Sequence, residues 1–279
     1  MKTKLIALGP KGSYGHEAAQ IGEKWLGNVY ISFVSTNVSI LSAAQSEITY
    51  AIVPIENSSY GDVVDVLGHL ARQSVDYPLR IIGQVELPIR HCLMARKGTT
   101  IEELELIMSH PQAIGQCGES IKRWGVKTES VPTSTADAAK FVSGHSERKL
   151  GAIASELAAK EYGLNVIERN VQTLDDNTTR FLIFGPESKS SPTGKDKTVI
   201  IFKVPNIPGA LFEAQRSFAA RNINMTAIHS IPLGGWKYSF YVEIEGHVLD
   251  TQVSEALIEL KEKTSELWIL GSFPKDLIV

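Results

Sequence analysis

The chain has 279 residues, a formal net charge of −3, 43% hydrophobic residues and 21% charged residues. This length allows about two domains, and the composition is that of an ordinary globular protein. The slightly negative charge excludes a bulk positive field that would attract nucleic acid or an anionic membrane, so we expect neither as a partner. No stretch approaches the ~20 apolar residues of a membrane span. Residues 1–10 lack the long apolar region of a secretory signal.

The chain contains two cysteines, Cys92 and Cys117, and neither belongs to a CxxC pair. A disulfide framework and a zinc site are therefore not expected, and no other metal-ligand motif is present. Without an export signal we expect reduced thiols and a cytoplasmic location.

Strands and helices are predicted to alternate before residue 186, which is typical of parallel sheets covered by helices. The expected strands are 5–8, 29–33, 50–55, 81–88, 91–96, 107–109, 128–131 and 150–153. The expected helices are 17–25, 37–46, 63–73, 113–124, 135–143 and 156–162. Two successive strands within 80–96 indicate the start of a second sheet. We therefore predict two lobes with a cleft between them, 1–79 with 175–185, and 80–174.

Residues 186–197 hold Pro, Gly, Ser and charged residues, which is linker composition. After them, strands are expected at 198–204, 225–232, 236–244 and 267–272, with helices at 209–221 and 251–264. This βαββαβ order is typical of a ferredoxin-like domain, here 198–279.

Several predicted strands end in polar residues where a helix begins, and ligands of open α/β sheets bind at such ends. Residues 7–19, ALGPKGSYGHEAA, place glycines and Ser13 before a helix, which is either an anion site or a bare Gly-rich turn. Residues 51–64, AIVPIENSSYGDVV, gather Glu56, Asn57 and Ser58 after a strand. Helix capping alone would not need so many polar groups, so we favour a site.

Three more junctions repeat this arrangement. Residues 107–117, IMSHPQAIGQC, carry Ser109, His110 and Gln116; residues 131–139 and 152–159 add further hydroxyls. In residues 175–185, DDNTTRFLIFG, Thr178, Thr179 and Arg180 stand where a loop enters a strand. Many neutral donors beside one arginine suit a small carboxylate ligand, which Arg180 could bind with two hydrogen bonds.

Together, the motifs GPKGSYG, PIENSSYGDVV, SHPQAIGQC, STADAA, AIASELAAKEYGL and NTTRFLIFG resemble those of prephenate dehydratase. The C-terminal segment, with NIPGALFEAQRSFAARNINMTAIHSIP, resembles the ACT domain that follows in this family. The resemblance implies a catalytic domain like type II periplasmic binding proteins, with the active site between two lobes. It implies conversion of prephenate to phenylpyruvate, water and CO2, a step of phenylalanine synthesis, without a metal or organic cofactor.

The resemblance also implies roles for individual residues. Thr179 would act on the departing hydroxyl, Arg180 would hold a carboxylate or the loop, and Phe181 would pack. Substrate-binding residues would be Ser13, Glu56, Asn57, Ser58, Ser109, Gln116 and Thr178. The first motif usually reads GPxGTFS; here Ser13 keeps its hydroxyl and Gly15 loses one.

The regulatory motifs are only partly present. The GAL motif is intact as Gly209, Ala210 and Leu211, but ESRP is replaced by His229, Ser230, Ile231 and Pro232. The resemblance still implies an amino-acid effector, phenylalanine, and we expect it to contact Asn206, Gly209, Ala210, Leu211, His229 and Ser230. It also implies a homodimer or homotetramer formed through the ACT domains.

Two alternatives stay open. Arogenate dehydratase performs the same chemistry on the aminated substrate, and sequence reading does not separate it from prephenate dehydratase. A non-catalytic amino-acid sensor with both folds is the other alternative, although a sensor would need no leaving-group donor.

Overall fold

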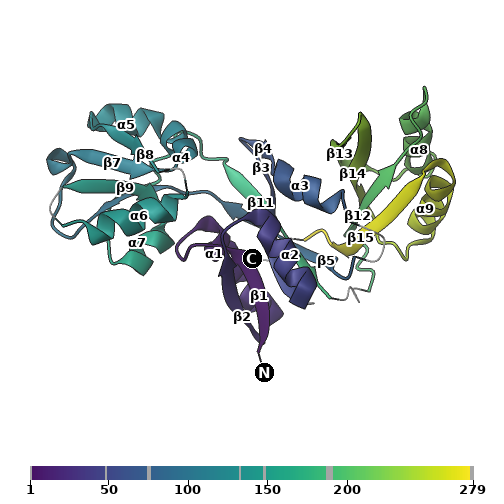
Figure 1. Ribbon diagram of the computed structural model, residues 1–279, viewed down its shortest axis with the longest axis horizontal. Coiled ribbons are helices and arrows are strands. Elements are labelled where there is room, and N and C mark those ends of the chain that lie inside the picture. The colour runs from purple at the N-terminus through teal and green to yellow at the C-terminus, as the bar shows by residue number, and fades with distance from the viewer. Residues whose placement is uncertain are drawn as a thin grey trace.

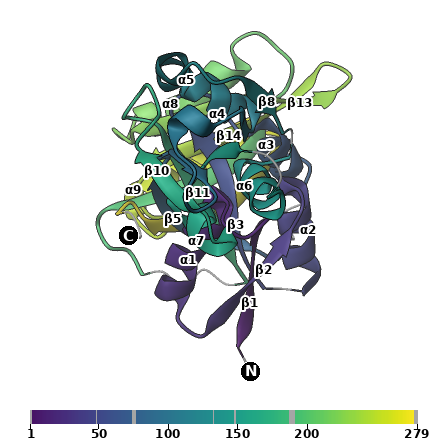
Figure 2. The same cartoon turned by 90° about the vertical axis from the view of Figure 1, so that its left-hand side faces the viewer.

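The computed structural model describes residues 2–47, 49–73, 77–131, 133–146, 149–186 and 191–276. Three bodies follow one another along its longest axis (Figure 1), and Figure 2 views the molecule from the end formed by the second lobe. Residues 187–190 of the predicted linker lie outside the described part. Within that part no helix is long and apolar enough to cross a membrane.

The first lobe, in the centre of Figure 1, is built on a six-stranded sheet. Its strand order is β2 (Val29–Val34), β1 (Thr3–Leu8), β3 (Tyr50–Asn57), β11 (Thr178–Gly185) and β5 (Arg80–Pro88), with β4 (Gly61–Asp62) paired to β3. The helices are α1 (Tyr14–Leu26), α2 (Asn37–Glu47) and α3 (Val64–Leu70). Apolar residues of α1 pack with one face of the sheet, and those of α2 and α3 pack with the other.

The second lobe has a five-stranded sheet and lies at the left of Figure 1. Its strand order is β10 (Asn165–Arg169), β6 (Cys92–Ala95), β9 (Leu150–Ala154), β7 (Leu106–Ser109) and β8 (Thr128–Ser130). The helices are α4 (Pro111–Gln116), α5 (Gly118–Trp124), α6 (Thr135–Gly144) and α7 (Glu156–Tyr162), with a 3₁₀ turn at Ile101–Glu103. The single helix expected at 113–124 is thus two helices, which meet at Cys117. Strand β10 was not expected from the sequence.

Both sheets are mixed, so the prediction of parallel sheets is wrong in part. Strands β1, β2 and β3 are parallel, as are β7, β8 and β9. By contrast, β11 is antiparallel to both β3 and β5, and β6 is antiparallel to β9 and β10. The chain crosses between the lobes twice, and the strands at these crossings run against their neighbours.

The boundary between the lobes lies later in the chain than predicted. Residues 80–88 form β5, which pairs along its length with β11 in the first sheet, for example Leu87 with Thr179. The predicted division at residue 80 is therefore wrong, and the second sheet begins at Cys92.

The C-terminal domain has the predicted βαββαβ order and a four-stranded antiparallel sheet. Its elements are β12 (Asp196–Lys203), α8 (Ala210–Ala219), β13 (Met225–Gly234), β14 (Lys237–Glu245), α9 (Thr251–Lys263) and β15 (Glu266–Pro274). Strands lie in the order β13, β14, β12, β15. Val199, Tyr241 and Trp268 of this sheet share one buried cluster with Leu182 and Phe184 of β11. The C-terminal domain therefore packs directly on the sheet that carries Thr179, Arg180 and Phe181.

Candidate active site

A cleft of about 280 Å³ opens between the two lobes. The first lobe and the crossover contribute Leu8, Gly9, Ser13, Tyr14, Gly15, Ser35, Pro54, Asn57, Ile89, His91, Thr179 and Phe181. The second lobe contributes His110, Gln112, Ala113, Gln116, Thr133, Ser134 and Thr135. Among the described residues that line it, the cleft has no Asp, Glu, Lys or Arg. Its polar groups are hydroxyls, amides, imidazoles and backbone N–H groups.

Asn57 and Thr179 form a pair at the centre of the first-lobe wall. They face each other in the β3–β11 register, and Asn57 Nδ2 lies 3.0 Å from Thr179 Oγ1. The backbone N–H groups of Ser59 and Tyr60 each donate to Asn57 Oδ1 over 3.0 Å. These contacts fix the amide so that its NH2 group donates to Thr179. The Thr179 hydroxyl, already an acceptor on one side, has its own proton available for a ligand.

His91 joins the two walls of the cleft. Its Nε2 lies 2.6 Å from Gln116 Oε1, and its Nδ1 lies 2.7 Å from the Tyr14 hydroxyl. The same hydroxyl lies 2.9 Å from the carbonyl oxygen of Arg90. Burial lowers the pKa of His91 despite the Gln116 hydrogen bond, which raises it. Burial also raises the pKa of Tyr14 well above its ordinary value, so both groups are neutral near pH 7.

Three helix N-termini reach the cleft. Ser13 caps α1 by accepting from His16 N–H, His110 caps the short α4 through Nδ1, and Ser134 caps α6 by accepting from Asp137 N–H. The first N–H groups of a helix carry a partial positive charge and favour anions. Since Nδ1 of His110 accepts a hydrogen bond, its remaining ring proton is on Nε2. The cleft can thus hold carboxylates without a cationic side chain.

Arg180 does not line this cleft. Side chains alternate along β11, so Thr179 and Phe181 point to the cleft while Arg180 points to the opposite side of the sheet. There Arg180 Nη2 lies 2.6 Å from Glu56 Oε2 and 2.8 Å from Glu243 Oε1. Of the two roles expected for Arg180, binding a substrate carboxylate is therefore corrected, because its guanidinium already pairs with Glu56 and Glu243. The other role, holding the loop, stays a prediction.

Because side chains alternate in this way, three residues predicted to bind the substrate do not line the cleft. Glu56, Ser58 and Thr178 line a separate cavity of about 240 Å³ between the first lobe and the C-terminal domain. Ser58 Oγ donates to the carbonyl of Asp176 and accepts from the Thr178 N–H, so it fixes the loop before β11.

Ser109 has a structural role as well. It is fully buried, and its hydroxyl donates to the carbonyl oxygen of Ile153 over 2.6 Å, which ties β7 to β9. Ser13 lines the cleft, but its hydroxyl is largely used for capping α1 and contacting Leu8. Of the predicted substrate-binding residues, the cleft brings together Ser13, Asn57 and Gln116 with the predicted catalytic residues Thr179 and Phe181.

The comparisons with known proteins agree with this arrangement. The family model for prephenate dehydratase matches residues 5–189, and that for the ACT domain matches residues 198–262. The chain belongs to the prephenate dehydratase family. Its fold is the expected two-lobed α/β catalytic domain, of the type II periplasmic-binding-protein kind, followed by an ACT domain.

Three relatives show how far the similarity extends. Arogenate dehydratase 2 of Petunia hybrida is 40% identical over 243 residues, which cover 81% of this chain and 60% of that protein. The bifunctional chorismate mutase/prephenate dehydratase of Aquifex aeolicus is 36% identical over 281 residues, covering 99% and 75% respectively. The crystal structure of prephenate dehydratase in complex with L-Phe from Arthrobacter aurescens has a TM-score of 0.88 and 30% identity, covering 98% and 90%. The chain thus spans only three fifths of the petunia relative.

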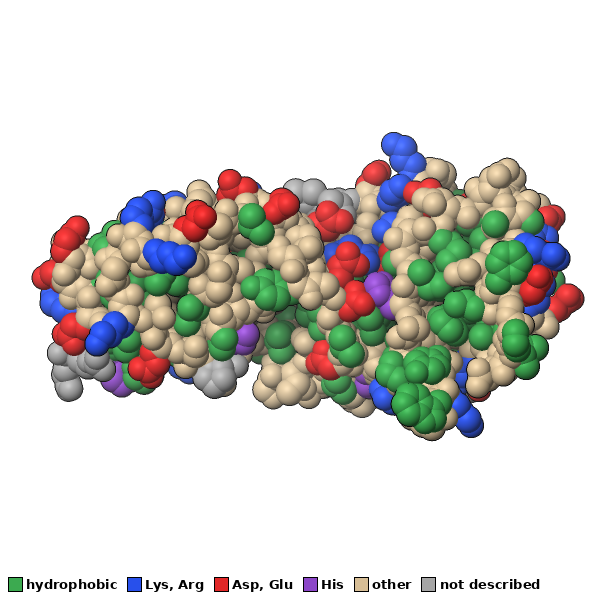
Figure 3. Space-filling view, turned by 90° about the horizontal axis from the view of Figure 1, so that it is seen from above, with side chains coloured by type: hydrophobic (Ala, Val, Ile, Leu, Met, Phe, Trp, Pro, Cys, Tyr) green, Lys and Arg blue, Asp and Glu red, His purple; other side chains and the backbone are tan. Residues whose placement is uncertain are grey.

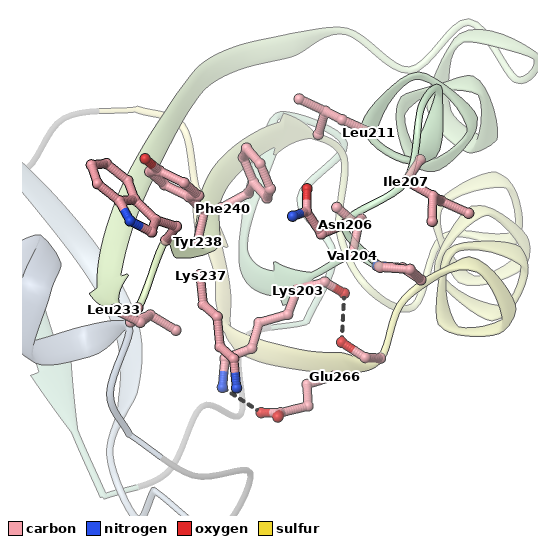
Figure 4. Close-up of a pocket in the computed structure, with 15 residues that line it drawn as sticks. Lys203, Val204, Asn206, Ile207, Leu211, Leu233, Lys237, Tyr238, Phe240 and Glu266 are labelled. Atoms are coloured by element: carbon pink, nitrogen blue, oxygen red, sulfur yellow. Dashed lines mark hydrogen bonds and ion pairs between the residues drawn. The ribbon is translucent and has the colours of Figure 1, made fainter.

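The ACT domain has its own pocket of about 670 Å³ (Figure 4). Asn206, Ala210 and Leu211 of the predicted effector site line it, together with Tyr238 and Phe240. Gly209 stands at the N-cap of α8 with a positive φ of 80°, which favours glycine. Lys203 and Glu266 close one side with an ion pair of 2.7 Å.

His229 and Ser230 do not line this pocket, and their place in an effector site stays a prediction. His229 Nδ1 instead lies 2.7 Å from Asp62 Oδ2 of the first lobe. The departure from the ESRP motif thus coincides with a contact between the ACT and catalytic domains.

Sequence reasoning missed Tyr14, His91 and Gln112 in the cleft. His91 gave no signal, because it stands inside a predicted strand and contacts residues far away in the chain. Tyr14 and Gln112 stand inside the noted motifs GPKGSYG and SHPQAIGQC, so a systematic survey of residues beside each helix N-cap could have found them.

Proposed function

We propose that this chain converts prephenate to phenylpyruvate, water and CO2, in the synthesis of phenylalanine. Membership of the family supports the reaction class. The observation that carries the proposal is the Thr179 hydroxyl, oriented by Asn57 over 3.0 Å in a cleft whose described lining has no Asp, Glu, Lys or Arg.

The proposed reaction does not need a strongly acidic side chain beside the leaving oxygen. The bond between the ring and its carboxylate breaks, its electron pair enters the ring, and the bond between C4 and its hydroxyl oxygen breaks. The oxygen leaves with the electron pair of that bond and takes up one proton, supplied ultimately by solvent, to end as water, and aromatisation drives the step. Thr179 donates a hydrogen bond to that oxygen as negative charge develops on it, which stabilises the transition state. Asn57 keeps the donor aimed, so little reorganisation is needed.

The carboxylates of prephenate would be held by neutral donors. Helices α1 and α6 present their N-termini to the cleft from opposite lobes, and His110 and Gln116 add side-chain donors. An ionised arginine in this position would also stabilise the ground-state carboxylate that must be lost. A neutral cleft avoids this, since only interactions stronger in the transition state accelerate the reaction.

Arogenate is the second candidate substrate, because relatives such as the petunia protein are named arogenate dehydratases. Arogenate carries an ammonium group where prephenate has a ketone. An ammonium group taken out of water needs a carboxylate partner, and the described lining of the cleft offers none. We therefore favour prephenate as the better substrate.

The test is turnover of each substrate by the purified chain, with phenylpyruvate measured as the product of prephenate and phenylalanine as the product of arogenate. We expect a higher kcat/KM for prephenate. A preference for arogenate would replace the substrate assignment, and no turnover of either would favour an amino-acid sensor.

We further propose that phenylalanine regulates the enzyme through the ACT domain. The related structure from Arthrobacter aurescens is a complex with L-Phe, and the pocket of Figure 4 combines aromatic walls with Asn206 and charged groups at its rim. Inhibition of prephenate turnover by phenylalanine, weakened by Leu211→Asp, is the expected result. Unchanged turnover at saturating phenylalanine would contradict it.

A homo-oligomer and a cytoplasmic location complete the proposal. Figure 3 shows hydrophobic side chains gathered on the ACT domain, where Ile207, Phe212 and Trp236 are exposed, and β13 is an edge strand. These features support pairing of ACT domains as a dimer or tetramer, and sedimentation of a monomer at every concentration would contradict it. Both cysteines are free and buried, which supports a reducing compartment.

A further inference from the structure

Glu243 of the ACT domain is a fully buried carboxylate with four donors around it. Arg180 binds it with two hydrogen bonds, Nη2 to Oε1 over 2.8 Å and Nη1 to Oε2 over 3.0 Å. The Tyr241 hydroxyl donates to Oε1 over 2.8 Å, and Lys197 Nζ donates to Oε2 over 3.2 Å. Buried charges persist only when they are paired in this way. The ACT domain thus holds the Arg180 guanidinium in one orientation.

Arg180 connects Glu243 to the residues that line the cleft. It is the chain neighbour of Thr179, and it also binds Glu56, the chain neighbour of Asn57. The register pairs Arg180 with Glu56 and Thr179 with Asn57. Thr179 and Asn57 face the cleft, and Arg180 and Glu56 face the ACT domain. The two pairs are therefore one residue apart on β3 and β11.

A β-bulge lies at this point. The β3–β11 register shifts between Arg180 and Phe181, and a bulge changes the local direction of side chains. The interdomain cavity of about 240 Å³ also borders Arg180 and Glu243. The Arg180 side chain therefore borders open space beside a local irregularity of the β3–β11 pairing.

A second contact from the ACT domain reaches β4, which pairs with β3. His229 Nδ1 lies 2.7 Å from Asp62 Oδ2. Strand β4 pairs Asp62 with Glu56 and Gly61 with Asn57. The ACT domain therefore contacts β11 through Glu243, and it contacts β4, the strand paired with β3, through His229.

We infer that Glu243 is a positioning residue of the active site, supplied by the ACT domain, which acts through Arg180 and Glu56 to aim Thr179 and Asn57. The regulatory domain is then a permanent part of the catalytic machinery as well as the holder of an effector pocket. This inference rests on the proposed dehydratase function.

The test is Glu243→Gln, which keeps the shape and removes the charge. We expect kcat to fall about tenfold to a hundredfold, as for small displacements of catalytic groups, with KM changed less than about twofold. In a Thr179→Ala background, where the aimed hydroxyl is absent, Glu243→Gln is expected to cause no further loss. An equal loss in both backgrounds, or wild-type kcat in folded Glu243→Gln, would overturn the inference.

Two further variants keep the test decisive. Thr198→Val removes the hydrogen bonds of the Thr198 hydroxyl to Ser272 and to the Gly246 carbonyl, within the ACT domain and away from Arg180. It therefore shows what a general loss of ACT stability does to kcat. Tyr241→Phe removes only one donor from Glu243, and serves if Glu243→Gln does not fold. We expect it to lower kcat about threefold.

Hydrogen exchange separates this inference from the proposed function. Glu243→Gln, or Tyr241→Phe in its place, is expected to speed amide exchange in residues 178–185 and 55–62, and Thr198→Val is not. This result would support the coupling even if the wild type formed no phenylpyruvate, an outcome that would refute the function alone. Unchanged exchange in these segments would overturn the coupling.

Discussion

Thr179 and Arg180 are adjacent residues that serve opposite sides of one sheet. Thr179 lines the cleft and accepts a hydrogen bond from Asn57, while Arg180 lies in the interface with the ACT domain. The sequence could indicate that the TTRF stretch is functional, but it could not assign each side chain to a side. That assignment depends on which face of β11 meets the cleft, and this is decided by long-range packing of the sheet.

At the residue scale, the burial of His91 predicts how the stability of the fold depends on pH. Burial lowers its native pKa below the ordinary value of about 6.5, so the unfolded chain binds more protons as the pH falls through that value. Stability is therefore lost on acidification from about pH 6.5 down to the native pKa, and not below it. Burial lowers the pKa of His16 and of His110 in the same direction.

Urea unfolding at about pH 7.5 and about pH 5.5 measures this loss, because the two values lie on either side of the ordinary histidine pKa of about 6.5, where the loss begins. In His91→Gln the loss is expected to be smaller than in the wild type. An equal loss in both proteins, or a gain of stability on acidification, would contradict the assignment of His91 as a buried neutral group.

At the scale of elements, the strands and helices were largely predictable from local pattern. The hydroxyls before α1, α6 and α7 do act as caps: Ser13, Ser134 and Ser155 each accept from a helical N–H. The pattern could not show that capping and site formation coincide at α1 and α6. It also failed for β5, because a strand does not carry the identity of its sheet in its own residues.

The loop before α1 closes one side of the cleft, and a substitution at Gly12 tests this role. Gly12 has a positive φ of 81°, and a Cβ there would lie 2.8 Å from Ala158 Cα of the second lobe. The carbonyl of Gly12 accepts from Ser155 Oγ over 2.8 Å. Gly12→Ala is therefore expected to separate the lobes, raise KM and cost about 1–2 kcal/mol of stability.

Gly163→Ala is the matched control, since Gly163 also has a positive φ but a Cβ there would meet no atom within 4 Å. It is expected to lower the melting temperature and leave KM unchanged. Steady-state kinetics and thermal unfolding of both variants decide the point, and a wild-type KM in Gly12→Ala would exclude the loop from cleft closure.

At the scale of the whole molecule, the ACT domain and the first lobe form one folded unit. They share a buried apolar cluster, and Gln84 Nε2 donates to the carbonyl of Lys275 over 2.8 Å. The sequence indicated a catalytic domain followed by an ACT domain, and the two family models match the chain in that order. It could not indicate this interface, because apolar residues of β12 and β14 are equally consistent with a core of their own.

A substitution at Gly271 tests whether the ACT domain and the first lobe unfold together. A Cβ there would lie 2.2 Å from the carbonyl oxygen of Ile81, so the backbones of β15 and β5 are in direct contact. Gly271→Ala is expected to destabilise both domains together by about 1–3 kcal/mol, as overpacking does. Calorimetry should show that the variant shifts the unfolding of both. A shift confined to an isolated ACT transition would contradict the shared core.

The central claim is that the Thr179 hydroxyl acts on the leaving oxygen, and two adjacent substitutions test it most directly. Thr179→Val and Thr178→Val each replace a hydroxyl by a methyl group at nearly constant volume, on opposite sides of β11. We expect single-turnover conversion of prephenate to slow about 10²–10⁴-fold in Thr179→Val and to stay within about twofold of the wild type in Thr178→Val. Rapid turnover by folded Thr179→Val, or equal losses in both variants, would contradict the account.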